Sequence, residues 1–202
     1  MQVAFKDDSI KKIKIIEKIS SFLPSTHKFL DYLPEPWRSR AILLGYKFGL
    51  INKVGYVKIT GYTDDTFTKR TGQESITCNI IPNVGVTQIR DILAGTSSNL
   101  PKNIEFGTST TTPAVGDTDL GAPLSVNDRL VATVTTPGSY ELRFEVFITS
   151  TYGPARPYTI NEFGLFADPE ESGILIAHAL VSPGHEMSGT NTAIATYGLL
   201  LR

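Results

Sequence analysis

The stretch NIEFGTSTTTPAVGDTDLG, residues 103–121, decides how the rest of the chain is interpreted. It opens with a short apolar strand, Ile104 to Phe106, which ends at Gly107. A Thr/Ser run, a proline and a Gly-Asp-Thr-Asp-Leu-Gly turn follow. Because such a polar, turn-rich segment can bury little of itself, we expect residues 108–121 to form a long ordered excursion between two strands of an all-β domain.

Alternation of apolar and polar residues predicts strands on both sides of this excursion. The alternation is clearest over 140–148, where Phe144 and Val146 are separated by Glu145. Further strands are expected at 76–82, 104–106, 130–135, 158–167, 174–181 and 192–201, with 183–189 as the loop between the last two. A short helix over 87–93, capped by Thr87 and ended by Gly95, precedes the excursion. Residues 76–202 are therefore predicted to form an antiparallel β-sandwich, or an open barrel, in a mainly β protein.

The first 63 residues predict a different kind of structure, an α-helical docking segment. Apolar residues recur at helical spacing after Asp8-Ser9, and prolines at 24, 34 and 36 separate three short helices. Residues 54–63 read as a strand or an extended arm, and the polar residues 64–75 as a linker. Three short helices form a marginal core, so we expect their apolar residues to contact another subunit or the rest of the chain. The candidates for this contact are Ile13, Ile16, Ile19 and Trp37.

Composition and charge narrow the classes of protein. The chain has 202 residues with 41% apolar and 19% charged content, which is ordinary for a folded domain. Residues 1–75 carry 13 Lys+Arg and 8 Asp+Glu, but the positive charges are scattered, so a solvated face is expected rather than a nucleic-acid surface. A membrane span is not expected, because the sequence contains no apolar run of 18 residues. The single Cys78 rules out an intrachain disulfide and a Cys-based zinc cluster.

Several motifs in a fixed order resemble a widespread group of structural proteins from tailed bacteriophages. The series is NVG at 83–85, ILAG at 92–95, IEFGTST at 104–110, GDTDLG at 116–121, INEFGLF at 160–166 and GILIAHA at 173–179. The resemblance covers residues 76–202, and the first 75 residues lie outside it. Two positions depart from the usual pattern: Ser109 stands where glycine is preferred, and His178 where arginine is common.

The resemblance implies a non-enzymatic virion component of the tail, baseplate, fibre or collar, made in the host cytoplasm. It would form symmetric homo-oligomeric contacts and bind other virion proteins. An alternative is a receptor- or glycan-binding module at a tail tip or fibre, which would use the loops 153–157 and 183–189.

Glu162 is the one acidic residue in the apolar strand 158–167. A buried carboxylate needs a partner, and Arg129, just after the excursion, is the nearest candidate in the motifs. We therefore expect a structural ion pair between Glu162 and Arg129 that anchors the excursion to the sheet. Catalytic use of Glu162 is disfavoured, because no second carboxylate or histidine accompanies it within its motif.

No other motif indicates catalysis, a cofactor or a metal. Asp117 and Asp119 have the spacing of calcium ligands but lack the further acidic residues of such a loop, so capping and Asx-turn roles are expected. His185-Glu186 lacks the rest of a zinc-protease motif, and His178 is isolated and expected to be packed or on the surface. No nucleophile elbow and no phosphate-binding loop occurs. Contact with a partner or glycan is instead expected at Thr110, Thr112, Tyr152, Arg156 and Tyr158.

Overall fold

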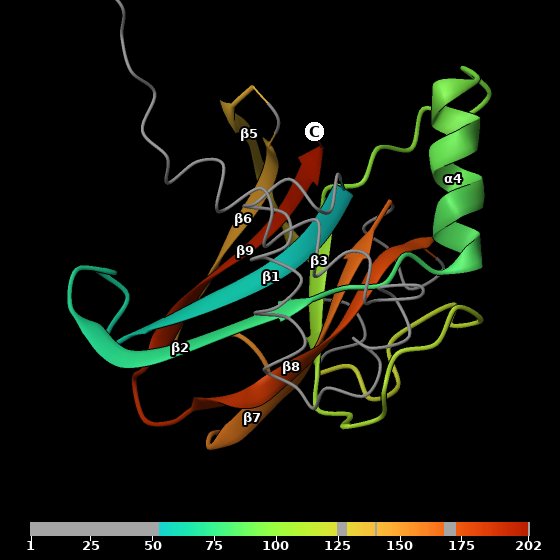
Figure 1. The fold of residues 1–202 in the computed structure, drawn as a ribbon. Helices are drawn as coiled ribbons and strands as arrows, with labels where there is room; N and C mark the ends of the chain where they lie inside the picture. The colour runs from blue at the N-terminus through green and yellow to red at the C-terminus, as the bar shows by residue number, and fades with distance from the viewer. Residues whose placement is uncertain (1–52, 125–128, 140, 168–172, 202) are drawn as a thin grey trace, which may run out of the picture.

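Two antiparallel sheets packed face to face make up the part of the chain that the computed structural model describes, residues 53–124, 129–139, 141–167 and 173–201 (Figure 1). The five-stranded sheet has the order β2 (Arg70–Cys78), β1 (Lys53–Tyr62), β9 (Thr192–Leu201), β6 (Glu141–Ile148) and β5 (Thr133–Gly138). The four-stranded sheet has the order β4 (Leu130–Val131), β3 (Asn103–Gly107), β7 (Tyr158–Phe166) and β8 (Leu175–Met187). One helix, α4 (Asn83–Leu93), lies among the described residues. The predicted mainly β sandwich with one short helix is confirmed.

The core lies between the two sheets and follows the alternation seen in the sequence. On β6, Phe144 and Val146 are buried, whereas Glu145 between them points away from the core. Aromatic rings join the sheets, because Phe163 of β7 stacks on Tyr197 of β9 with ring centroids 5.7 Å apart. Phe106 of β3 meets Phe163 edge-on at 6.0 Å. Such contacts add to the free energy gained by removing apolar area from water.

The predicted boundary at 64–75 is wrong. Residues 53–62 form the strand β1, which pairs with β9 on one side and β2 on the other. Residues 64–69 make the turn of the β1–β2 hairpin, and β2 begins at Arg70. The polar residues of β2 misled the prediction, since an edge strand can be exposed along one half and still pair through its backbone. Ile13, Ile16, Ile19 and Trp37 lie outside the described residues.

The last two strands also differ from the prediction. β8 continues through Pro183 to Met187, so most of the predicted loop 183–189 is strand, and the turn falls at 188–191. Pro183 is tolerated because β8 is the edge strand of its sheet. The Ser75 hydroxyl of β2 donates to the Pro183 carbonyl at 2.9 Å, which ties the two sheets together along this side.

Helix α4 begins earlier than predicted, at Asn83, with Pro82 at the N-cap position and no side-chain cap. Gly95 ends it as predicted, with a positive φ of 70° and its N–H bonded to the Ile92 carbonyl at 3.0 Å. Gly85 faces β8 so closely that a Cβ there would lie 2.6 Å from the Ile176 carbonyl oxygen. Leu93, the last residue of α4, is 83% exposed.

Candidate functional site

The excursion of residues 108–121 lies between two strands, β3 and β4, as expected, and its end comes back alongside β3 (Figure 1, yellow-green). At its base the Thr108 N–H donates to the Ala122 carbonyl at 2.8 Å. Next to this bond, on the side away from the excursion, the Leu124 N–H donates to the Phe106 carbonyl at 2.8 Å. Farther along, the Asn83 N–H at the start of α4 donates to the Val115 carbonyl at 2.8 Å, so the excursion also contacts the helix. Backbone hydrogen bonds thus fix the base of this Thr-rich segment and join its far part to α4.

Glu162 of β7 holds the returning end of the excursion. Its side chain is buried, and its carboxylate accepts the Gly121 N–H at 2.7 Å and the Ala122 N–H at 3.2 Å. Charged acceptors make stronger hydrogen bonds with backbone N–H groups than neutral ones do. Gly107 gives the carboxylate its room, because a Cβ at this position would lie 2.3 Å from Glu162 Oε2.

His178 of β8 completes this arrangement from the neighbouring strand. Its Nε2 lies 2.8 Å from Glu162 Oε1, and its Nδ1 lies 2.8 Å from Asp117 Oδ2 in the excursion. Asp117 also accepts the Ala114 N–H at 2.7 Å, so one carboxylate organises the turn and contacts the imidazole. We call Asp117, Glu162 and His178 the acid–histidine clamp. The imidazolium form satisfies both carboxylates, since it donates from both ring nitrogens.

Electrostatics favour that charged form. Burial alone lowers the pKa of His178, but hydrogen bonds and Coulombic attraction from Glu162 and Asp117 raise it further than burial lowers it. The net effect is a pKa above the ordinary value of 6.5. Through these contacts the clamp fastens the excursion to β7 and β8.

Arg129 forms a second buried ion pair, and this corrects the predicted pair. Its Nε lies 2.9 Å from Glu105 Oε2, its guanidinium stacks on the Phe166 ring at 3.6 Å, and Asp119 Oδ1 lies 3.8 Å away. Glu162 was the expected partner of Arg129, but its ion-pair contact is with His178. The expectation that a buried Glu162 anchors the excursion holds. The partner was wrong because Glu105, on β3 directly beside β4, lies closer to where Arg129 enters the sheet.

Apolar contact supports the two ion-pair groups. Leu120, next to Gly121, is buried against Phe166 and Leu175, with Val84 of α4 at the edge. The excursion thus contributes one hydrophobic side chain to the body of the molecule. Its other end stays accessible, and Thr110, Thr112 and Val115 are exposed.

Three of the predicted contact residues are structural instead. Tyr152 and Tyr158 are buried, and the Tyr158 hydroxyl donates to the Tyr152 carbonyl at 2.6 Å. The Arg156 guanidinium donates to the Thr149 carbonyl at 2.9 Å and also to the Asn191 carbonyl. These three side chains therefore hold the loop 153–157 in place. The prediction that they face a partner or a glycan is wrong, because their polar groups bind backbone carbonyls of the chain itself.

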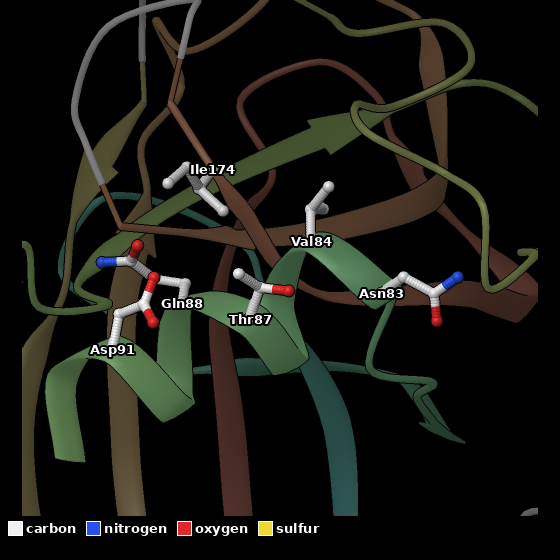
Figure 2. A pocket seen from close by; sticks show the side chains of 6 residues that line it. All are labelled: Asn83, Val84, Thr87, Gln88, Asp91 and Ile174. Carbon is white, nitrogen blue, oxygen red and sulfur yellow. The ribbon is translucent and has the colours of Figure 1, made fainter. Parts of the chain in front are cut away.

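An open pocket of about 320 Å³ lies between α4 and the start of β8 (Figure 2). Figure 2 shows Ile174 on the wall opposite the helix, which contributes Asn83, Val84, Thr87, Gln88 and Asp91. Gln88 is already engaged, since its amide donates to the Ser97 hydroxyl at 2.8 Å and to the Asn99 carbonyl at 2.9 Å. Asp91 is paired with Arg90 at 2.7 Å.

Among the described residues, no group of three His, Cys, Asp or Glu residues is placed to hold a metal ion. The clamp does not qualify, because the imidazole lies between its carboxylates instead of sharing one point with them. No helix in the described ranges is long and apolar enough to cross a membrane.

In the clamp, the residue whose role the sequence did not reveal is His178. It was treated as isolated because its two partners lie 61 and 16 residues away along the chain. One signal was present: His178 occupies the position of an arginine in the resembled pattern, where a cation would face the buried Glu162.

Comparisons with family models, curated proteins and solved structures found no match to this chain.

Proposed function

We propose that this chain is a non-enzymatic structural component of a tailed-phage virion. It would act as an adaptor or assembly protein of the tail, baseplate or neck, in symmetric contacts with copies of itself and with other virion proteins. The ordered motif series over residues 76–202 supports this proposal. The buried contacts that hold the excursion in one conformation support it further.

The observation that carries the proposal is the anchored excursion. The acid–histidine clamp and Leu120 hold one long segment against the four-stranded sheet, while Thr110, Thr112 and Val115 face solvent. Burying charges is costly and contributes little net stability, so such pairs are better explained by a need for one defined conformation. A rigid exposed segment suits a repeated contact, because it loses little conformational entropy when a neighbour binds.

The alternative, a receptor- or glycan-binding module, loses the features on which it depended. Tyr152 and Tyr158 are buried, Arg156 is bonded to backbone carbonyls, and most of 183–189 belongs to β8. We therefore propose the structural role alone.

The test uses a phage whose genome encodes this chain. Deletion of the coding sequence is expected to leave particles that lack a tail, baseplate or neck component and do not infect, as seen by negative-stain electron microscopy and plaque counts. Complementation with the intact chain should restore both, and mass spectrometry should detect the chain in purified particles. Normal infectious particles from the deletion strain, with the chain absent from wild-type particles, would overturn the proposal.

A second variant separates contact from folding. Thr110→Lys with Thr112→Lys places two cations on the exposed part of the excursion, away from the clamp. We expect this variant to fold but to complement the deletion poorly. Thr87→Lys, an exposed change of the same type on α4, is the matched control and should complement fully.

A further inference from the structure

Strand β5 (Thr133–Gly138) is an edge strand that other described residues leave open. It pairs with β6 on one side, and the sheet order ends at β5 on the other. All six of its residues are exposed. Figure 1 shows β5 at the border of the five-stranded sheet beside β6. An edge strand presents a row of N–H and C=O groups that can pair with another strand.

This edge lacks the features that usually prevent pairing. The segment 130–138, LVATVTTPG, contains no charged residue. Val134 of β5 is 46% exposed. Natural edge strands are commonly protected by lysine, by inward-pointing charges or by proline, and here Pro137 protects only the last part of β5. Valine and threonine are also the residue types that favour strands.

We propose that β5 pairs antiparallel with β5 of a second copy of this chain, with Val134 opposite Val134. The two five-stranded sheets would then become one continuous sheet across a two-fold axis. An antiparallel pair of identical strands obeys this symmetry by construction, because each residue meets its counterpart twice. The uncharged edge favours a second copy as the occupant, since self-pairing brings no like charges together.

The register of β6 gives a second reason for this occupant. Within one copy, Thr133 lies opposite Glu145, and Thr135 lies opposite Arg143. With Val134 at the centre, Thr133 of one copy faces Thr135 of the second copy. Four side chains then lie in line across the joined sheet: Glu145, Thr133, Thr135 of the second copy and Arg143 of the second copy. The symmetric line starts from Arg143, so opposite charges flank both threonine pairs. Threonine pairs across strands are themselves favourable.

Glu145 fits this arrangement. Among the described residues it takes part in no ion pair, whereas Arg143 is held by Glu141 at 2.9 Å. A second copy would bring a cation into the row that contains Glu145. Thr133 opposite Thr133 would bring Glu145 into line with Glu145 of the second copy, and Thr135 opposite Thr135 would do the same for Arg143.

The β5–β5 contact between two copies is small, so its test must detect weak pairing. Six residues bury far less than the roughly 800 Å² per partner of a standard interface. We expect weak pairing in dilute solution that becomes stable when copies are held together in an assembly. The inference deepens the proposed function and rests on it for that setting, but the pairing itself is measured on the purified full chain.

The experiment uses single cysteines in a full-length Cys78→Ser background. Val134→Cys should form a disulfide with its own copy under mild oxidation, because opposed residues of an antiparallel pair have Cα atoms about 4.5–5.5 Å apart, within disulfide range. Thr133→Cys and Thr135→Cys should each cross-link poorly alone and efficiently when mixed. Thr87→Cys on α4 is the exposed control. We expect Val134→Cys to cross-link about tenfold faster than this control or more.

Adding Thr135→Glu to the Val134→Cys chain should abolish the difference, because it places an anion in line with Glu145 of the second copy. Val134→Cys that cross-links no faster than Thr87→Cys, or a Thr133 and Thr135 mixture no faster than either alone, overturns the inference. The structural role then stands if deletion still disrupts particles. Conversely, efficient pairing by a chain that particles do not contain would leave β5 pairing intact and remove the virion role.

Discussion

At the scale of single residues, the clamp depends on His178, because its imidazole lies between the two carboxylates. Replacing it with alanine leaves Glu162 and Asp117 facing each other without a cation. Breaking a buried pair costs about 3–5 kcal/mol, and the two backbone N–H groups that Glu162 keeps should reduce this to about 2–3 kcal/mol. Urea unfolding at pH 6 measures the loss.

The control for this prediction is Glu74→Gln. Glu74 pairs with Lys58 at 2.8 Å on the surface of the five-stranded sheet. Exposed pairs contribute about 0–1 kcal/mol, so this change should alter the free energy of unfolding little. Equal effects of the two substitutions would show that the clamp has no special role in stability.

At the scale of elements, the excursion needs glycine where it leaves β3. A Cβ on Gly107 would lie 2.3 Å from Glu162 Oε2 and 2.7 Å from the Ala122 carbonyl oxygen. We expect Gly107→Ala to displace the carboxylate and to cost about 1–3 kcal/mol, as overpacking does elsewhere. Hydrogen exchange should report faster exchange at the Gly121 and Ala122 amides.

Gly116→Ala is the matched control for this substitution. Its Cβ would meet nothing within 4 Å, and its backbone has no positive φ. We therefore expect a change within about 0.5 kcal/mol and unaltered exchange at residues 121 and 122. Faster exchange in the Gly116 variant as well would mean that the excursion loosens for reasons other than crowding at Gly107.

Element positions were largely predictable from the sequence, whereas their pairing was not. Period-2 alternation located β6, β7 and β9, because it follows directly from which side chains face the core. The buried Glu162 was recognised in the same way. Its partner depended on register: Glu162 lies opposite Leu180, which puts His178 two residues along on the same face of β8. Alternation gives the face of each strand but not the register between strands.

Polar edge strands were the other failure. Arg70 to Gln73 of β2 and Ser182 to Gly184 of β8 carry little apolar signal, yet they lie along the side where the two sheets are tied together. Their strand conformation comes from backbone pairing and from bonds such as Ser75 to Pro183, which no local pattern encodes.

At the scale of the whole molecule, two buried histidines on β8 set opposite limits on stability as pH changes. The pKa of His178 is raised above 6.5 by its carboxylates, so its contribution is fully present below pH 6.5 and is lost as pH rises through its folded-state pKa. Burial lowers the pKa of His185 to about 4, so its contribution is present above pH 6.5 and is lost as pH falls toward 4. Stability should therefore be greatest near pH 6.5.

Substitution separates the two sides of this profile. His178→Gln should flatten the decline of the melting temperature above pH 6.5. His185→Leu should remove up to about 3 kcal/mol of the loss between pH 6.5 and 4, because a buried neutral imidazole no longer has to take up a proton on unfolding. The Nδ1 of His185 has no hydrogen-bond partner in the described part of the chain, so leucine sacrifices no bond at that atom. Melting curves from pH 4 to 9 for both variants measure this, and an unchanged acid side in His185→Leu would show that other groups control acid unfolding.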